Sequence, residues 1–262
     1  MPAIREPAVA GLFYPADPLR LAAGVRALLA AAPARTARPR ALVVPHAGYV
    51  YSGGVAASAY ALLRPHAAAL RRVVLLGPAH RVALRGLALP RCEVFATPLG
   101  PVAIDGEMCA RLDAPGPVSR SDAAHAREHS LEVQLPFLQE VLGEFLLVPL
   151  VVGEASADEV AHVIAEVADE PGTLLVVSTD LSHYHDYATA CALDRATCAV
   201  IEALDWRALT PQRACGAVAL AGLLQFAEAR GLRAHRVELC NSGDTAAGDR
   251  ERVVGYGAWY FD

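Results

Sequence analysis

Short, continuous runs of Val and Leu recur along the chain and predict β-strands that are buried on both faces. The four clearest runs lie at 41–45, 72–77, 145–152 and 173–178. Shorter apolar segments near Leu87 and Val94, separated by Pro and Gly, predict edge strands. Two closing strands are expected at 232–239 and 252–261.

Segments with apolar residues at helical spacing lie between these runs. They predict helices at 19–31, 54–63, 105–112, 130–142, 188–204 and 215–229. Pro136 should kink or restart the fourth helix. Ser156 and Glu159 match a capping box, which predicts a helix reaching about Ala168. Thr210 before Pro211 predicts another helix start, and residues 113–126 are expected to form a loop.

The alternation of strands and helices predicts an α/β fold. We expect a single domain over residues 1–262, in which helices flank both faces of a central, largely parallel or mixed β-sheet. In such a sheet, the carboxyl ends of neighbouring strands border one crevice, where residues distant in sequence meet. Side chains that directly follow the buried runs are therefore the best candidates for function.

Histidines follow three of the four runs: His46, His80 and His183. A single histidine at a strand end is most often a hydrogen-bonded loop residue, but three of them favour convergence on one ligand or metal. Imidazole nitrogen suits Fe, Zn, Cu or Ni, and two histidines with one further donor leave coordination positions open for substrate. His46 and His80 are the strongest candidate metal ligands.

Other polar residues near these strand ends are candidates for supporting roles. Asp180 lies three residues before His183, so on a helical turn it would orient that imidazole or bind metal itself. Glu128 or His129 would supply a general acid or base, although an acidic helix N-terminus is an equally good interpretation. Cys240 is either a soft metal ligand or a core thiol.

Composition excludes several classes of function. Although 54% of the residues are apolar, no run approaches the roughly 20 residues that span a bilayer. The net charge is −5, without the arginine cluster that nucleic-acid binding requires. The absence of lysine excludes Schiff-base chemistry. Arg5, Glu6 and repeated prolines stand where a secretory signal would be apolar, so a cytoplasmic location is expected.

The motifs AGLFYP, PHAGYVYSG, GPAH, EHSLEVQLPFL, STDLSHYH, Cys215-Gly216, NSGD and VVGY occur in this order over nearly the whole chain. This series resembles the Memo family, whose bacterial and archaeal members are called AmmeMemoRadiSam system protein B. The resemblance implies a fold similar to the extradiol (LigB-type) dioxygenases, which use non-haem Fe(II). It also implies a site formed by His46 and His80, with Asp180 and His183 nearby.

The resemblance leaves the third ligand open. Animal Memo proteins add a cysteine near the C-terminus, and counting back from 253–256 places that position close to Asp244 or Thr245, so Cys240 lies too early. Asp244 or His183 is therefore an expected ligand. We expect Fe(II), with Cu or Zn as alternatives.

Two functions are compatible with this resemblance. In the first, a metal site performs dioxygenase-like redox chemistry on a small organic substrate, and His129, Asp180 and Glu128 serve as acid/base or orienting groups. In the second, the chain is a non-catalytic metal- or peptide-binding accessory of an AMMECR-type protein and a radical S-adenosylmethionine enzyme.

Overall fold

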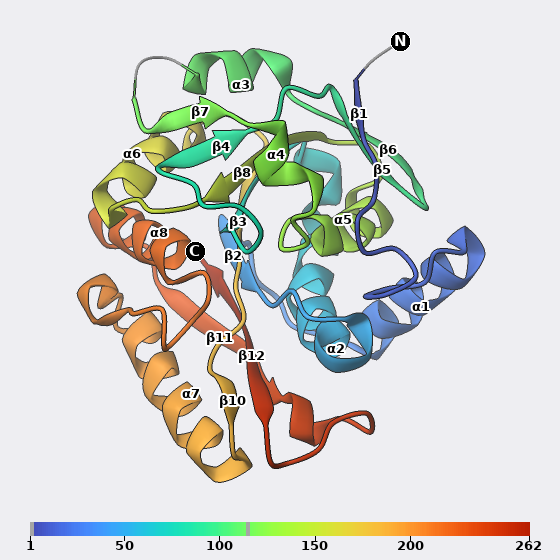
Figure 1. Ribbon diagram of the computed structural model, residues 1–262, viewed down its shortest axis with the longest axis vertical. Coiled ribbons are helices and arrows are strands. Elements are labelled where there is room, and N and C mark those ends of the chain that lie inside the picture. The colour runs from blue at the N-terminus through green and yellow to red at the C-terminus, as the bar shows by residue number, and fades with distance from the viewer. Residues whose placement is uncertain (1–2, 114–115) are drawn as a thin grey trace.

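A computed structural model describes residues 3–113 and 116–262, and its centre is a mixed sheet of nine strands (Figure 1). Eight strands follow the order β10-β12-β2-β9-β3-β8-β4-β7, and β11 pairs with β12. The four inner strands are parallel and coincide with the four clearest apolar runs: β2 (Ala41–Val44), β9 (Thr173–Ser178), β3 (Arg72–Pro78) and β8 (Leu146–Val152).

Shorter or antiparallel strands extend the sheet on both sides. They are β4 (Leu87–Leu89), β7 (Val118–Arg120), β10 (His183–His185), β11 (Ala234–Asn241) and β12 (Val253–Phe261). A separate three-stranded sheet contains β1 (Ile4–Arg5), β5 (Val94–Thr97) and β6 (Gly100–Ala103). The mixed character of the main sheet confirms the predicted fold class.

Helices cover both faces of the main sheet, because successive strand residues point to opposite sides and both sides are apolar. Leu42 and Val44 pack into one core, and Ala41 and Val43 into the other. The first core includes α1 (Pro18–Ala31), α2 (Tyr49–Tyr60), α4 (Asp122–Ala126) and α5 (Leu135–Leu142). The second includes α3 (Gly106–Leu112), α6 (Ala157–Ala168), α7 (Tyr187–Glu202) and α8 (Ala217–Arg230).

The structure corrects four local predictions. The expected loop at 113–126 contains β7 and α4, because Ser121 caps a short helix; residues 114 and 115 lie outside the described part. The helix expected at 54–63 begins earlier, after Gly48. Thr210 opens no helix, because its carbonyl closes a turn and α8 begins only at Ala217.

The fourth correction concerns the segment that follows β9. Residues 179–182 are not a helical turn, and His183 begins the short strand β10. By contrast, Pro136 restarts a helix as expected: it lies in the first turn of α5, after the 3-10 turn Glu132–Gln134. The capping box of Ser156 and Glu159 is confirmed. Among the described residues, no helix has the length and apolar character needed to cross a membrane.

Candidate metal centre

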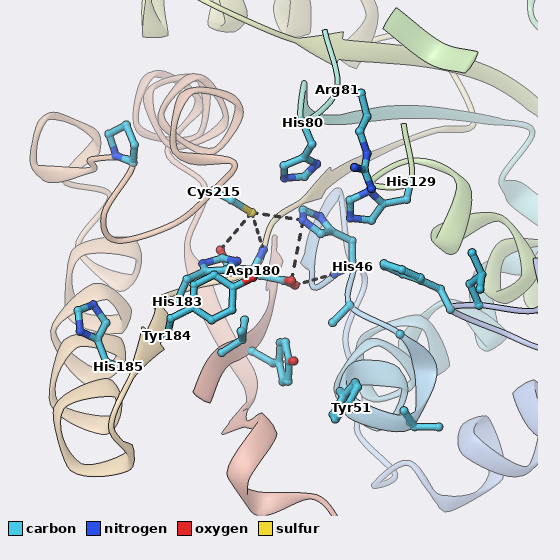
Figure 2. Close-up of a pocket in the computed structure, with 18 of the residues that line it drawn as sticks. His46, Tyr51, His80, Arg81, His129, Asp180, His183, Tyr184, His185 and Cys215 are labelled. Carbon is cyan, nitrogen blue, oxygen red and sulfur yellow. Dashed lines mark hydrogen bonds and ion pairs between the residues drawn. The ribbon is translucent and has the colours of Figure 1, made fainter. Parts of the chain in front are cut away.

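Three adjacent strands bring the predicted residues together. β2 and β3 both pair with β9 in parallel, so their carboxyl ends form one edge. His46 follows β2, His80 follows β3, and Asp180 follows β9 (Figure 2). The imidazole rings of His46 and His80 lie 5.1 Å apart between centres. Residues that are far apart in sequence therefore meet at the carboxyl ends of neighbouring strands, as the parallel sheet predicts.

His46 is buried and held in one tautomer by the end of β9. Its backbone N–H donates to Asp180 Oδ1 at 2.8 Å, and its Nδ1 lies 2.8 Å from Ser178 Oγ. Ser178 donates its own hydroxyl hydrogen to the Ser130 carbonyl and accepts from Gln134 Nε2. The Ser178 oxygen is thus an acceptor for His46 Nδ1–H, which leaves a lone pair on His46 Nε2.

A buried carboxylate fixes His80 in the same tautomer. Glu128 Oε1 lies 2.9 Å from His80 Nδ1, and Oε2 accepts the His80 backbone N–H at 2.6 Å. Burial alone would raise the pKa of Glu128, but hydrogen bonds from His80 and Ser130 lower it to about 2. The ionised carboxylate accepts Nδ1–H, so His80 Nε2 also keeps a free lone pair.

Close packing at Gly77 in β3 brings the Glu128 loop to His80. A Cβ on Gly77 would lie 2.7 Å from Ser130 Oγ, so only glycine lets the loop approach this closely. Glu128 also accepts the backbone N–H groups of His129 and Ser130, each at 2.9 Å. With its oxygens occupied and its pKa low, Glu128 is suited to positioning His80 rather than to exchanging protons at neutral pH.

Cys215 provides a third donor that the sequence analysis did not select. Its Sγ lies 3.2 Å from His46 Nε2 and accepts the Asp180 backbone N–H at 3.3 Å. Thr179 Oγ1 accepts the Gly216 N–H at 2.9 Å and thereby ties the turn before α8 to the end of β9. Burial, followed by the nearby Asp180 carboxyl, raises the pKa of Cys215 to about 12.

The donor atoms of His46, His80 and Cys215 all lie within 4.8 Å of one another. Tetrahedral ligands of one ion at bond lengths of about 2.0–2.3 Å are separated by roughly 3.5 Å, so small side-chain adjustments suffice to close this set on a metal. Two imidazoles and a thiol form a donor set for a transition metal. Glu128 and His129 make a second group with His80, but the oxygens of Glu128 are already hydrogen-bonded.

His129, Asp180 and His183 surround this cluster. The His129 ring stacks on His80 with centres 4.8 Å apart, and burial lowers its pKa to about 4. Asp180 is buried, which raises its pKa to about 7 although the His46 N–H opposes the shift. His183 lines the same cavity, with Nδ1 held by the Leu181 carbonyl at 2.8 Å, but it is not one of the three clustered donors.

The structure does not bring Asp244 or Cys240 into the cluster. Asp244 accepts hydrogen bonds from Tyr187 Oη at 2.7 Å and from the Asn241 backbone at 3.0 Å, at the 3-10 turn that precedes β12. Cys240 lies on β11, and both line a different, smaller pocket. The donor that the structure brings to the two histidines is therefore Cys215 and not Asp244. The intact motif Cys215-Gly216 was the signal that could have identified it.

A cavity of about 840 Å³ opens in front of the cluster. It is lined by the histidines, Asp180 and Cys215, by aromatic side chains, and by one arginine, Arg81 (Figure 2). The fold and this cavity define an α/β protein with a His-His-Cys cluster at the carboxyl edge of its parallel strands.

Comparison with known proteins identifies the family. The chain matches the Memo-like protein family over residues 5–260. A MEMO1 family protein of Aquifex aeolicus is 35% identical, with 97% of each chain covered, and one of Archaeoglobus fulgidus is 37% identical, with 98% and 99% covered. The chain belongs to the Memo family.

A solved structure supports the fold independently. The crystal structure of the uncharacterized protein JW3007 from Escherichia coli K12 superposes with a TM-score of 0.53 over 83% of this chain and 98% of that chain. The two sequences are 16% identical, so this likeness concerns the fold alone.

Proposed function

We propose that His46, His80 and Cys215 bind a single transition-metal ion, and that the site performs redox chemistry on a small organic substrate. The main support for metal binding is that each imidazole keeps an unprotonated nitrogen near the Cys215 sulfur. Hydrogen bonds behind each ring place the protons on Nδ1, so Nε2 of both histidines is free beside the Cys215 sulfur.

The donor set bears on the identity of the metal. Imidazole suits iron, copper and zinc alike, whereas thiolate favours the softer ions. Fe(II) remains our first expectation, and the sulfur donor makes copper and zinc direct competitors. Binding requires the thiolate, and a cation at this position supplies the charge that stabilises it against burial.

The residues around the donors suit proton transfer and substrate orientation. When bound, the metal supplies redox chemistry between an electron-rich substrate and dioxygen; incorporation of both oxygen atoms into the substrate needs no external reductant. Burial keeps His129 neutral at pH 7, so this side chain accepts a proton from a substrate hydroxyl. Asp180 orients His46 through the backbone N–H.

Metal loading of the purified protein tests the first part of the proposal. The protein is incubated anaerobically with Fe(II), Cu(I) or Zn(II), freed of unbound metal, and measured for metal content. We expect one ion per chain in the wild type and in Cys240→Ser, and a loss of most of the metal in Cys215→Ser. Equal metal content in the two variants would contradict the assigned donor set.

Oxygen consumption tests the second part. The iron-loaded protein is mixed with catechol in an oxygen electrode, and the His129→Gln variant serves as a comparison. We expect uptake in the wild type and a marked decrease in the variant. Retention of metal without uptake would instead favour a non-catalytic accessory role, and the partnership with an AMMECR-type protein and a radical S-adenosylmethionine enzyme stays a prediction.

A further inference from the structure

Exposed apolar side chains gather at the mouth of the metal cavity. Eight large hydrophobic residues are exposed in the described part of the chain, and four of them line this cavity: Leu12, Val50, Tyr51 and Tyr184. Leu12 and Val50 are 79% and 72% exposed. Single exposed apolar residues are ordinary, but their concentration around one opening marks a binding surface.

Tyr184 reaches this surface through an unusual backbone conformation. Its φ of 60° lies in the left-handed region, which aromatic residues rarely adopt. The register between β10 and β12 is irregular between His183 and His185. As a result, three consecutive residues line the cavity, whereas a regular strand would turn the middle one away. Strained residues of this kind concentrate at ligand sites.

The Tyr184 ring packs against two neighbouring side chains. The guanidinium carbon of Arg252 lies 5.2 Å from the ring centre, and the His183 ring lies 5.7 Å away at an edge-on angle. Phe13, which also lines the cavity, packs edge-on against His129 with ring centres 4.9 Å apart. At least two aromatic rings, those of Phe13 and Tyr184, therefore line the cavity, and such rings prefer to pack against another aromatic group.

Arg81 provides a positive charge in this aromatic setting. It follows His80 directly, lines the cavity, and extends toward His129 (Figure 2). None of the hydrogen bonds or ion pairs found in the described part of the chain involves the Arg81 side chain. Within that part, the one carboxyl group that lines the cavity, that of Asp180, is buried and accepts the His46 backbone N–H. The guanidinium therefore offers its donors to a ligand, and its planar donor pairs fit carboxylate and phosphate groups.

We propose that the cavity binds a small aromatic molecule with an anionic substituent, a carboxylate or a phosphate. Arg81 holds the anionic group, and the rings of Tyr184 and Phe13 contact the aromatic body. That this ligand is a substrate rests on the proposed function, to which the inference adds the chemical class of substrate for the same cavity. The binding itself requires no metal.

Calorimetric titration of chelator-treated, metal-free protein tests this assignment. Benzoate and benzamide are planar probes of nearly the same shape that differ in charge. We expect benzoate to bind at least about tenfold more tightly than benzamide, as a charge-assisted hydrogen bond predicts. Arg81→Gln should abolish this preference, whereas Arg85→Gln, in the same loop but outside the cavity lining, should keep it. Phenyl phosphate in place of benzoate distinguishes the two anionic groups.

A second comparison tests the aromatic wall. Acetate should bind more weakly than benzoate, and Tyr184→Gly should lower the affinity for benzoate while Tyr184→Phe retains it. Equal affinities for benzoate and benzamide in the wild type, survival of the preference in Arg81→Gln, or no binding of any probe would overturn the inference. Because metal is absent throughout, these outcomes are independent of whether Cys215→Ser loses iron.

Discussion

Replacement of Glu132 by Gln should destabilise the protein strongly, because this carboxylate anchors the N-terminal segment that forms one wall of the cavity. Glu132 is fully buried and accepts the backbone N–H groups of Ala8 and Val9 at 2.7 and 3.0 Å. Tyr14 Oη donates to it at 2.6 Å, and Arg5 forms an ion pair with it. The segment between these contacts carries Phe13 into the cavity.

The expected loss of stability follows from the interactions that a neutral amide at position 132 cannot make. An oxygen of Gln at position 132 can still accept from Val9 and Tyr14, but an NH2 group would face the donors of Ala8 and Arg5. Arg5, which is 6% exposed, keeps its bonds to the carbonyls of His125 and Glu128 but loses its carboxylate. Breaking a buried ion pair in this way costs about 3–5 kcal/mol. For a chain of this size, that loss lowers Tm by roughly 10 °C.

Urea denaturation followed by circular dichroism measures this loss. The matched control is Glu140→Gln, which removes the carboxylate from the pair between Arg26 and Glu140, whose side chains are 69% and 12% exposed. Because the cation of this pair stays in contact with water, the pair should contribute only about 1 kcal/mol, and the control should lose far less stability than Glu132→Gln. The reasoning is refuted if Glu132→Gln loses no more free energy of unfolding than Glu140→Gln.

Three further predictions concern the site and its supports. A Cβ at Gly216 would lie 2.8 Å from the Thr179 Cβ, so Gly216→Ala should cost about 1–3 kcal/mol of stability and weaken metal binding. Gly54 faces open space, so Gly54→Ala should stabilise the protein by about 0.5–1 kcal/mol. Urea denaturation of both variants measures these changes. Tyr184→Gly should leave thermal stability nearly unchanged, because relief of about 1–2 kcal/mol of backbone strain offsets the greater flexibility of glycine in the unfolded chain. A loss of stability above about 2 kcal/mol would contradict the inference that Tyr184 is strained. Metal binding at pH 8 should release about one proton per chain, because the pKa of Cys215 is about 12 and the thiol is protonated before the metal binds. Calorimetry in two buffers of different protonation enthalpy measures this release. No release would argue against a thiolate ligand.

Strand composition was sufficient to predict the inner sheet and two residues of the His-His-Cys cluster. The apolar runs at β2, β3 and β9 are unambiguous because both faces of these strands are buried, and parallel strands place His46 and His80 at one edge. Short elements such as β7 and α4 were missed, since three to five residues carry too few positions to show a periodicity.

The third donor could not be predicted from local pattern. Cys215 lies 169 positions after His46, in a turn without regular structure, and it reaches the site because Thr179 binds the Gly216 N–H. Asp244 was the expected alternative because it lies close to the position at which the family resemblance implies a further ligand, but its carboxylate caps the turn after Asn241. Apart from the motif Cys215-Gly216, only the tertiary contacts separate these two roles.

Cobalt(II) spectroscopy of the metal-free protein tests the central claim most directly, because a cobalt–thiolate bond gives a near-ultraviolet charge-transfer absorption that nitrogen and oxygen ligands do not. We predict that this absorption saturates at one Co(II) per chain in the wild type and in Cys240→Ser. It should be absent in Cys215→Ser, which keeps its far-ultraviolet circular dichroism. Full absorption in Cys215→Ser, or none in the wild type, would contradict the assignment of His46, His80 and Cys215 as the metal centre.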